Sequence, residues 1–284
     1  MKNYMDDKVN NKFNENFNNS FNDEYSELKK YNKREIKQYK KFRILKEHEK
    51  IDTGIFDKKT MQALSKFFNK GIISKVDYII ARGKEADVYI ATPGASEIVK
   101  NENKIILKFF RIETSSFYNM NDYITGDPRF KKISNNKYNL INEWCKKEFG
   151  NLQIAEKAKI RAPRPFMYYK SILAMSTITK SNELASRLKD TRLNDPKKVF
   201  DNIIKQINLL YKKELVHADL SEYNILIGDE ELPYFIDFGQ AVVLRHPNAI
   251  NFLKRDIENI SLYFSKSYNI KDNADKIFNK IIKV

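Results

Sequence analysis

The segment from Val216 to Gln240, VHADLSEYNILIGDEELPYFIDFGQ, limits the fold of this chain more than any other. Residues 224–227 and 232–236 are mainly apolar and suit two short strands, and the glycine between them favours a turn. Such a hairpin brings Asn224 toward Asp237 at one mouth of the domain. The chain must therefore fold so that polar side chains gather where these two strands begin and end.

Two carboxylates and an amide in this order are typical of phosphoryl transfer. Asp219 can position or deprotonate an acceptor, while Asn224 and Asp237 can hold Mg²⁺ against the phosphates of ATP. Each residue alone is more often a turn or cap residue. His217 stands two positions before Asp219, and Phe-Gly follows Asp237 directly, so chance is a poor explanation of the whole set. The segment predicts kinase-like chemistry.

A glycine loop is predicted at residues 82–87, between strand-like runs at residues 76–81 and 88–91. Glycine permits a backbone to approach a phosphate closely, so the loop around Gly83 is a candidate cover for a nucleotide. Most strand–glycine–strand segments are ordinary hairpins, however. The loop alone leaves both interpretations open.

The next predicted strand, residues 105–110, holds Lys108 among apolar residues. A predicted helix over residues 139–158 carries Glu148 inside its apolar stripe, where an unpaired carboxylate is costly. We expect Lys108 and Glu148 to pair, in the arrangement that orients ATP in kinases. Two other charged residues of the helix are expected at the surface: Glu143 and Lys147.

The connection from residue 112 to residue 137 is long and irregular, and such connections are usually functional or disordered. Ser115 and Ser116 within it are candidate sites of autophosphorylation, although a loop serine is usually only solvated. A later apolar strand is predicted at residues 172–175. The residues after it, Ser176-Thr177-Ile178, lie where a kinase binds adenine through backbone groups.

The C-terminal part of the chain is short for a kinase. A helix is predicted from Pro196 to Lys213 with Asp195 as its N-cap, and another from residue 248 to residue 264. Only 44 residues follow Gln240. The platform on which kinases bind a peptide substrate is therefore missing or much reduced.

These elements predict an α+β fold of the minimal bilobal, protein-kinase-like kind. Residues 51–175 form an N-lobe with an antiparallel sheet, one αC-type helix and the inserted flexible loop 112–137. Residues 176–284 form a reduced, mainly helical C-lobe. Residues 1–50 are a polar Asn- and Lys-rich extension that is expected to be partly disordered, because it has little apolar surface to bury.

Lys and Arg number 52 against 37 Asp and Glu, which gives a net charge of +15. This excess favours a polyanionic partner such as RNA, although the chain is also rich in Lys throughout. Cys145 is the only cysteine, so no intrachain disulfide can form, zinc binding is not expected and a reducing compartment is indicated. No membrane-spanning run or signal-peptide core is found, and a cytoplasmic location is predicted.

The chain resembles the RIO family of atypical serine/threonine protein kinases over residues 51–265. The long loop and the lack of a winged-helix start favour the first, RIO-one type subfamily over the second. The likeness is carried by residues at eight places: Gly83-Lys84-Glu85-Ala86-Asp87-Val88, Lys108, Arg111 to Ser115 with Gly126 to Phe130, Glu148, Met175-Ser176, His217 to Asn224, Asp237 with Gln240, and His246-Pro247.

The resemblance implies an enzyme that uses ATP and Mg²⁺, as a kinase or an ATPase, in late maturation of the small ribosomal subunit. Its partners would be the precursor rRNA and ribosomal proteins of that subunit. The implied catalytic residues are Asp219, Lys108, Glu148 and Asp237, with Asn224 and Asp237 as metal ligands and Asp237 as the site of a phosphoaspartate. The implied nucleotide contacts are Gly83, Lys84, Glu85, Ala86, Val88, Lys108, Met175, Ser176 and Ile178.

Two departures from the family pattern affect the nucleotide contacts. Arg82 replaces a small hydroxyl residue before the glycine, and Thr177 and Thr179 replace an aromatic residue and a glycine. Two other functions stay open. A small-molecule phosphotransferase of the aminoglycoside or choline kinase kind shares the His-x-Asp-x4-Asn block, but it needs a larger C-lobe. A nucleotide-gated assembly factor with vestigial catalysis would not need this intact set of catalytic residues.

Overall fold

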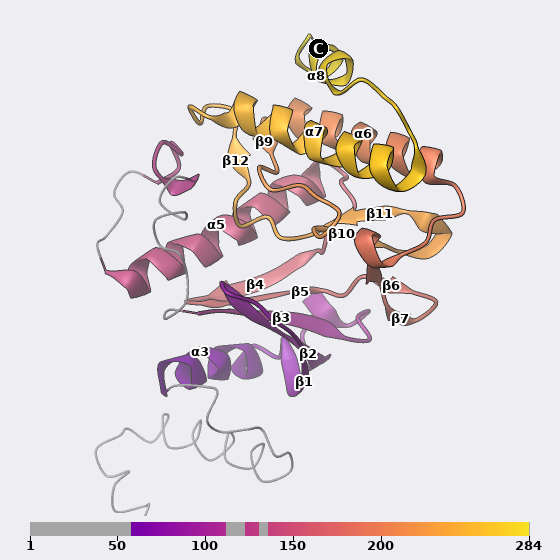
Figure 1. Cartoon of the computed structure of the whole chain (residues 1–284). Coiled ribbons are helices and arrows are strands. Elements are labelled where there is room, and N and C mark those ends of the chain that lie inside the picture. Colours follow the sequence, from indigo (N-terminus) through magenta and orange to yellow (C-terminus); the bar gives the residue numbers. More distant parts are fainter. Residues whose placement is uncertain (1–57, 112–122, 131–135, 284) are drawn as a thin grey trace, which may run out of the picture. The chain divides into compact units, whose positions relative to one another are not determined.

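The structure, a computed structural model, describes residues 58–111, 123–130 and 136–283. Residues 58–284 form one unit of the chain, and Figure 1 shows how its helices and strands are arranged. The expectations for the polar extension and for Ser115 and Ser116 lie outside the described residues.

A five-stranded antiparallel sheet forms the N-terminal part of this unit, in the order β1-β2-β3-β5-β4. The turn between the first two strands is tight, because Gly83 N donates to Ala86 O at 2.9 Å. A short 3-10 helix, η2, lies between the second and third strands. The bounds are β1 Ile73–Arg82, β2 Ala86–Pro93, η2 Glu97–Val99, β3 Ile105–Phe110, β4 Pro165–Tyr169 and β5 Ile172–Ser176.

Alternation along β3 directs its side chains to two faces of the sheet. Phe110 belongs to the large core cluster and Ile106 packs against it, whereas Leu107 and Phe109 are not part of that cluster. Lys108 shares the face of Ile106 and Phe110. This face is the one that the main core covers, so the lysine is directed inward.

Two helices flank the sheet, and Figure 1 shows them on opposite sides of it: α3 (Lys58–Asn69) and α5 (Lys137–Lys157). Helix α5 begins at Asn136, whose side chain accepts from Tyr138 N at 2.9 Å. Its apolar stripe includes Trp144 and the only cysteine, Cys145, and both are buried. The helix predicted over residues 139–158 is confirmed.

Three helices and several short strands form the C-terminal part. Helix α6 begins at Asp195, whose carboxylate accepts from Lys198 N at 3.0 Å, which confirms the predicted cap. The helices are α6 Pro196–Lys212, α7 Ala249–Tyr268 and α8 Ala274–Ile282. The short elements are β6 Thr179–Lys180, β7 Glu183–Leu184, β8 Ser186–Arg187, η3 Leu188–Asp190, β9 Leu215–Val216, β10 Ile225–Ile227, η4 Asp229–Glu231, β11 Pro233–Phe235 and β12 Val242–Val243.

The β10–β11 hairpin positions the functional residues. Ile225 pairs with Phe235, and Ile236 N donates to Asn224 O at 3.0 Å, just beyond the paired strands. Asn224 and Asp237 therefore lie at neighbouring ends of the hairpin, as the sequence predicts. None of the helices in the described residues is both long and apolar enough to cross a membrane.

Candidate active site

The centre of the site is Lys108 on β3, whose ammonium nitrogen contacts two carboxylates. Lys108 Nζ lies 2.9 and 2.8 Å from the two carboxylate oxygens of Glu148 on α5, and 2.8 Å from Asp237 Oδ1. The Lys108–Glu148 contact expected from the sequence is present. The Glu148 side chain is only 1% exposed, whereas that of Asp237 is 44% exposed. Of the two carboxylates, Asp237 is therefore the one that a ligand can reach.

Lys108 stabilises the charged form of each carboxylate, while Glu148 and Asp237 repel one another. Burial lowers the pKa of Lys108, but the charges of Asp237 and Glu148 outweigh it and raise that pKa well above its usual value. Partial enclosure acts to raise the pKa of Asp237, yet the Lys108 charge and hydrogen bond lower it. Burial raises the pKa of Glu148 to about 7. Lys108 therefore keeps its proton and Asp237 stays ionised at neutral pH.

Asp219 and Asn224 form the opposite side of the site. Asn224 Nδ2 donates to the main-chain oxygen of Asp219 at 2.8 Å and to its Oδ2 at 3.0 Å. Burial and the charge of Asp237 raise the pKa of Asp219 to about 6. A carboxylate with such a pKa is ionised at neutral pH and can still accept a proton, which suits a general base.

Residues 217–220 are held in an unusual conformation. Ala218 has a φ of +64°, in the left-handed region that non-glycine residues rarely adopt. Asp256 on α7 accepts from Ala218 N at 2.8 Å and from Leu220 N at 2.9 Å, and Arg255 donates to Ala218 O. These contacts fix the backbone on both sides of Asp219. Sequence reasoning missed Asp256 and Arg255. Asp256 shares the buried face of α7 with Leu253 and Ile260, so its inward carboxylate was a signal that could have found it, whereas the pattern gives none for Arg255.

His217 is a structural neighbour of the site. Its Nε2 lies 3.0 Å from Ile236 O, so this nitrogen donates to the carbonyl. Burial lowers the pKa of His217 to about 4, which keeps the imidazole neutral. His217 therefore links the segment before Asp219 to the strand end before Asp237, and carries no charge into the site.

The segment after Asp237 is held by α5. Lys147 Nζ donates to Gly239 O at 2.8 Å and to Ala241 O at 2.6 Å. Asn151, one turn later, donates to Phe238 O and Ala241 O, both at 2.8 Å. The expectation that Lys147 lies at the surface is wrong, because its side chain is buried and burial lowers its pKa to about 7. Glu143 is half-buried.

The described part of the long connection, residues 123–130, joins the same network. Arg129 donates to Asn151 Oδ1 at 2.8 Å and pairs with the buried Asp127 at 2.6 Å. His246 Nε2 lies 3.2 Å from Thr125 O. The Gly126 to Phe130 motif therefore ties the connection to α5 and to the segment after Asp237.

The glycine loop lies at the β1–β2 turn. A Cβ on Gly83 would approach Ala86 O to 3.0 Å, so a side chain there would crowd the turn. Lys84 is exposed and Val88 is paired with Lys108 across the sheet. Burial raises the pKa of Glu85, and the charge of Asp237 raises it further. The loop therefore faces Lys108 and Asp237.

The segment expected to bind adenine leaves β5. Met175 is buried, and Ser176 Oγ accepts from Arg164 N at 2.8 Å. Ser176 N donates to Arg164 O, and Ile178 O accepts from Ala185 N at 3.0 Å. Two of the main-chain groups available to adenine are thus already engaged in the protein.

The oxygen donors of the site suit a Mg²⁺ ion that is bound together with substrate phosphates. They do not form a metal site made of protein side chains alone. No group of three His, Cys, Asp or Glu residues able to hold a metal occurs in the described parts of the chain. Asp237 and the Asn224 amide oxygen are the hard oxygen donors at this place. Mg²⁺ is usually bound by one or two carboxylates together with substrate phosphates and water, and this set is of that kind.

The chain is similar to known proteins over most of its length. The family model described as RIO domain matches residues 87–277. The RIO-type serine/threonine-protein kinase Rio1 of Haloferax volcanii is 36% identical, over 76% of this chain and 72% of that protein. The protein of the same name from Thermoplasma acidophilum is 38% identical, over 63% of this chain and 94% of that protein.

A solved structure has the same fold. The crystal structure of the Rio2 kinase–ADP/Mg²⁺–phosphoaspartate complex from Chaetomium thermophilum gives a TM-score of 0.60 at 22% identity, covering 79% of this chain and 66% of that chain. The predicted α+β, minimal kinase-like fold is thus confirmed. With the family match and the Rio1 relatives, the chain belongs to the RIO domain family, in its Rio1 subfamily of atypical serine/threonine-protein kinases.

Proposed function

We propose that this chain binds ATP and Mg²⁺, transfers the γ-phosphoryl group to a serine or threonine hydroxyl or to water, and acts in maturation of the small ribosomal subunit. One observation carries the chemistry. Lys108 Nζ lies within 2.9 Å of carboxylate oxygens of both Glu148 and Asp237, at the end of the hairpin that also holds Asn224. This arrangement combines a phosphate-binding cation with an ionised metal ligand.

The transfer assigns a role to each residue. The acceptor oxygen bonds to the γ-phosphorus, the bond from that phosphorus to the β–γ bridging oxygen breaks, and ADP leaves with the electron pair. Asp219 receives the proton of the acceptor, and Lys108, held by Glu148, binds phosphate oxygens. Asn224 and Asp237 would hold Mg²⁺, which neutralises charge on the phosphates when bound. The glycine loop and residues 175–178 would hold the nucleotide.

A second route passes through Asp237 itself. The Rio2 structure from Chaetomium thermophilum contains a phosphoaspartate, and Asp237 here is ionised and reachable. In this route an Asp237 oxygen attacks the γ-phosphorus, ADP leaves, and water later cleaves the acyl phosphate to aspartate and phosphate. Incubation with ATP should then add one phosphoryl group that hydroxylamine removes. A phosphoryl group that withstands hydroxylamine would lie on a hydroxyl residue instead.

The ribosomal role is proposed from the charge of the chain and from the family resemblance. A net charge of +15 suits association with rRNA, and the family resemblance implies late maturation of the small subunit. We also propose a cytoplasmic location, and a division of the kinase unit into lobes at residues 51–175 and 176–284. In that division the N-lobe carries Lys108 and Glu148, and the C-lobe carries Asp219, Asn224 and Asp237.

The test is ATP turnover by the purified chain with Mg²⁺, with and without small-subunit precursor particles. We expect turnover that the particles stimulate and that Asp219→Ala and Asp237→Ala both abolish. Turnover that ignores the particles but rises with small hydroxylated or aminated acceptors would point to a small-molecule phosphotransferase. Normal particle binding and maturation by Asp219→Ala would point to an assembly factor that needs no catalysis.

A further inference from the structure

A cavity of about 450 Å³ lies beside the catalytic residues. Its walls come from the glycine loop (Glu85), the described end of the long connection (Tyr123), α5 (Trp144), the segment after Asp237 (Gln240) and α7 (Arg255). Residues 175–178, where adenine is expected, do not line it. The volume falls within the range of roughly 300–1,000 Å³ that is usual for ligand sites. The cavity is therefore separate from the proposed adenine site.

The cavity is connected to the catalytic base through Arg255. Arg255 donates to Ala218 O, next to Asp219, and its charge lowers the pKa of Asp219. Gln240 follows Asp237 by three positions. Asp219 and Asp237 do not themselves line the cavity, but Arg255 and Gln240 of its wall lie next to the segments that carry them.

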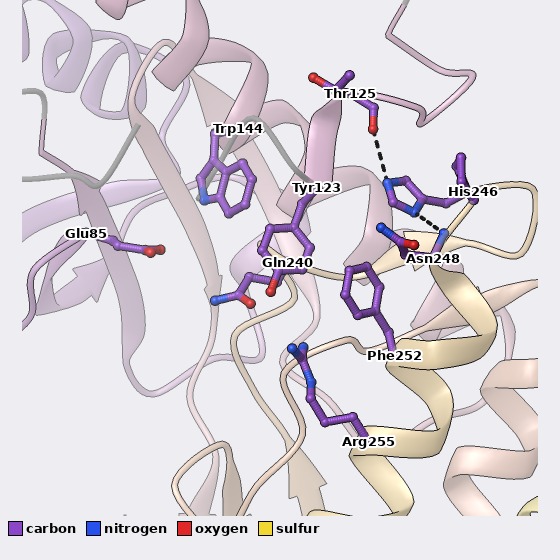
Figure 2. Close-up of a pocket in the computed structure, with 10 residues that line it drawn as sticks. Glu85, Tyr123, Thr125, Trp144, Gln240, His246, Asn248, Phe252 and Arg255 are labelled. Atoms are coloured by element: carbon purple, nitrogen blue, oxygen red, sulfur yellow. Dashed lines mark hydrogen bonds between the residues drawn. The ribbon is translucent and has the colours of Figure 1, made fainter. Parts of the chain in front are cut away.

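The lining shows which chemistry the cavity can bind. Figure 2 shows the Arg255 guanidinium directed toward Gln240 and Tyr123, with the Phe252 ring beside it. Tyr123 stacks on Phe252 with ring centroids 5.2 Å apart, and the Arg255 guanidinium lies 5.0 Å from the Phe252 ring. The aromatic groups thus form a wall whose cation–π position is already taken by Arg255. A second cation from a ligand would be repelled there.

Two amide side chains complete the polar part. Within the described residues, the side chains of Gln240 and Asn248 have no hydrogen-bond partner, and both line the cavity. An amide can both donate and accept, so such groups match the N–H and C=O of an extended peptide. His246, which also lines the cavity, is instead engaged with Thr125 O and Asn248 N, as Figure 2 shows.

The two ends of the cavity carry opposite charges. Glu85 lies on the side of the glycine loop, near Lys108 and Asp237, whereas Arg255 lies on the side of Asp219. The guanidinium presents five N–H donors and uses some of them on Ala218 O and on the Tyr123 hydroxyl, which leaves others for a ligand. A carboxylate of the ligand would bind at the Arg255 end, away from Glu85.

We propose that this cavity is the acceptor site, and that it binds a short extended peptide segment with an acidic side chain close to the phosphorylated serine or threonine. The inference rests on the proposed kinase function and names the substrate class of that site. Arg255 binds the acidic side chain, the amides of Gln240 and Asn248 bind the peptide backbone, and the hydroxyl faces Asp219. The net charge of +15 adds long-range attraction for such acidic segments.

The first experiment compares three serine peptides that differ only in their flanking residues, which are acidic, basic or alanine. We expect kcat/KM for the acidic peptide to exceed that for the alanine peptide about tenfold, the effect of one favourable charged contact. In Arg255→Gln the ratio of kcat/KM for the acidic peptide to that for the alanine peptide should fall to near one. Damage to the catalytic loop cannot produce this result, because it would slow both peptides equally. Equal rates for wild type, or a preference for the basic peptide, would overturn the proposal.

A second experiment blocks the cavity with a larger side chain. Asn248 is exposed at the N-terminus of α7 and its side chain makes no capping bond, so Asn248→Phe costs no cap. We expect it to raise the KM for the acidic peptide about tenfold or more, while the KM for ATP is unchanged. Asn251→Phe, an exposed position on the same helix outside the cavity, is the matched control and should change neither value. Equal effects of both variants would contradict the assignment.

Binding can be read without catalysis. Trp144 lines the cavity and is the only tryptophan of the chain, so its fluorescence reports occupancy. The acidic peptide with alanine in place of serine should shift this fluorescence in wild type and not in Asn248→Phe. No shift at saturating peptide would overturn the acceptor site, even if ATP turnover is normal. A chain that binds the peptide but shows no ATP-dependent chemistry would overturn the proposed function and leave the binding site standing.

Discussion

The raised pKa of Asp219 has a consequence for the pH dependence of activity. A general base must be ionised in the free enzyme, and burial with the charge of Asp237 sets the Asp219 pKa at about 6. The value of kcat/KM should therefore rise with pH through about 6 and level off near neutrality. A pH series of initial rates measures this.

The control for that series is Asp219→Asn, which cannot accept the proton. Its residual activity should be low and should not change between pH 5 and pH 8. A rise of the same size in Asp219→Asn would show that another group controls the profile.

Lys108 and Glu148 depend on each other in the core. In Lys108→Met, Glu148 stays buried without its cation, and breaking such a pair costs about 3–5 kcal/mol of unfolding free energy. The loss should be larger at pH 8 than at pH 6, because the Glu148 pKa is about 7 even with Lys108 present and the carboxyl takes up a proton at lower pH. Denaturant unfolding at the two pH values measures it.

The double variant Lys108→Met with Glu148→Met separates stability from activity. It removes both buried charges, so it should be more stable than Lys108→Met alone while it stays inactive. Asp237 also loses Lys108 in this variant, but its side chain is 44% exposed, so water can solvate its charge. A double variant that is less stable than the single variant would show that the pair is not the reason for the loss.

Two successive turns of helix α5 carry side chains that hold parts of the site in place. Glu148 holds Lys108, while Lys147 and Asn151 hold the main-chain oxygens that follow Asp237. Asp237 itself has a φ of +64°, so its backbone is strained and depends on such contacts. The helix therefore positions both the phosphate-binding cation and the proposed metal ligand.

Lys147→Met tests this role at nearly constant side-chain length. It leaves Gly239 O without its donor, which costs about 1–3 kcal/mol of stability, and it loosens the segment that carries Asp237. We expect the Mg²⁺ concentration for half-maximal turnover to rise several-fold. Lys146→Met is the matched control, because Lys146 is 52% exposed and its pair with Glu143 contributes little. If both variants respond alike to Mg²⁺, Lys147 has no part in positioning Asp237.

The contrast between Glu148 and Lys147 shows how far sequence reasoning reaches. Glu148 could be predicted, because an inward carboxylate on a helix needs a cation and the sequence offers a lysine inside a strand. Lys147 could not, because its partners are main-chain oxygens some 90 residues away and leave no residue pattern. Helices and strands followed from periodicity. The inward carboxylate of Asp256 could have been found in the same way as Glu148, but its main-chain partners at residues 218–220 depend on tertiary packing.

At the scale of the molecule, α7 begins at Ala249, twelve positions after Asp237. Little chain is left between them to build a platform for a substrate. Recognition of a large partner must therefore use other surfaces, and the net charge of +15 suits a partner with phosphate groups.

This charge predicts a strong effect of salt. The affinity for small-subunit precursor particles should fall steeply between 50 and 200 mM KCl, by about tenfold or more if several phosphates are contacted. Co-sedimentation at a series of salt concentrations measures it. The KM for ATP should change much less over the same range. An affinity for the particles that does not depend on salt would exclude rRNA phosphates as the main contact.

The buried thiol of Cys145 reports how often α5 separates from its neighbours. It is the only thiol, it is buried on α5 three residues before Glu148, and burial raises its pKa well above the usual value. A thiol reagent can react only when α5 separates from its neighbours, so the labelling rate counts those openings. Because Lys108 and Glu148 bridge that contact, MgATP should slow the labelling. The rate of labelling at this one native thiol therefore measures how often the site opens.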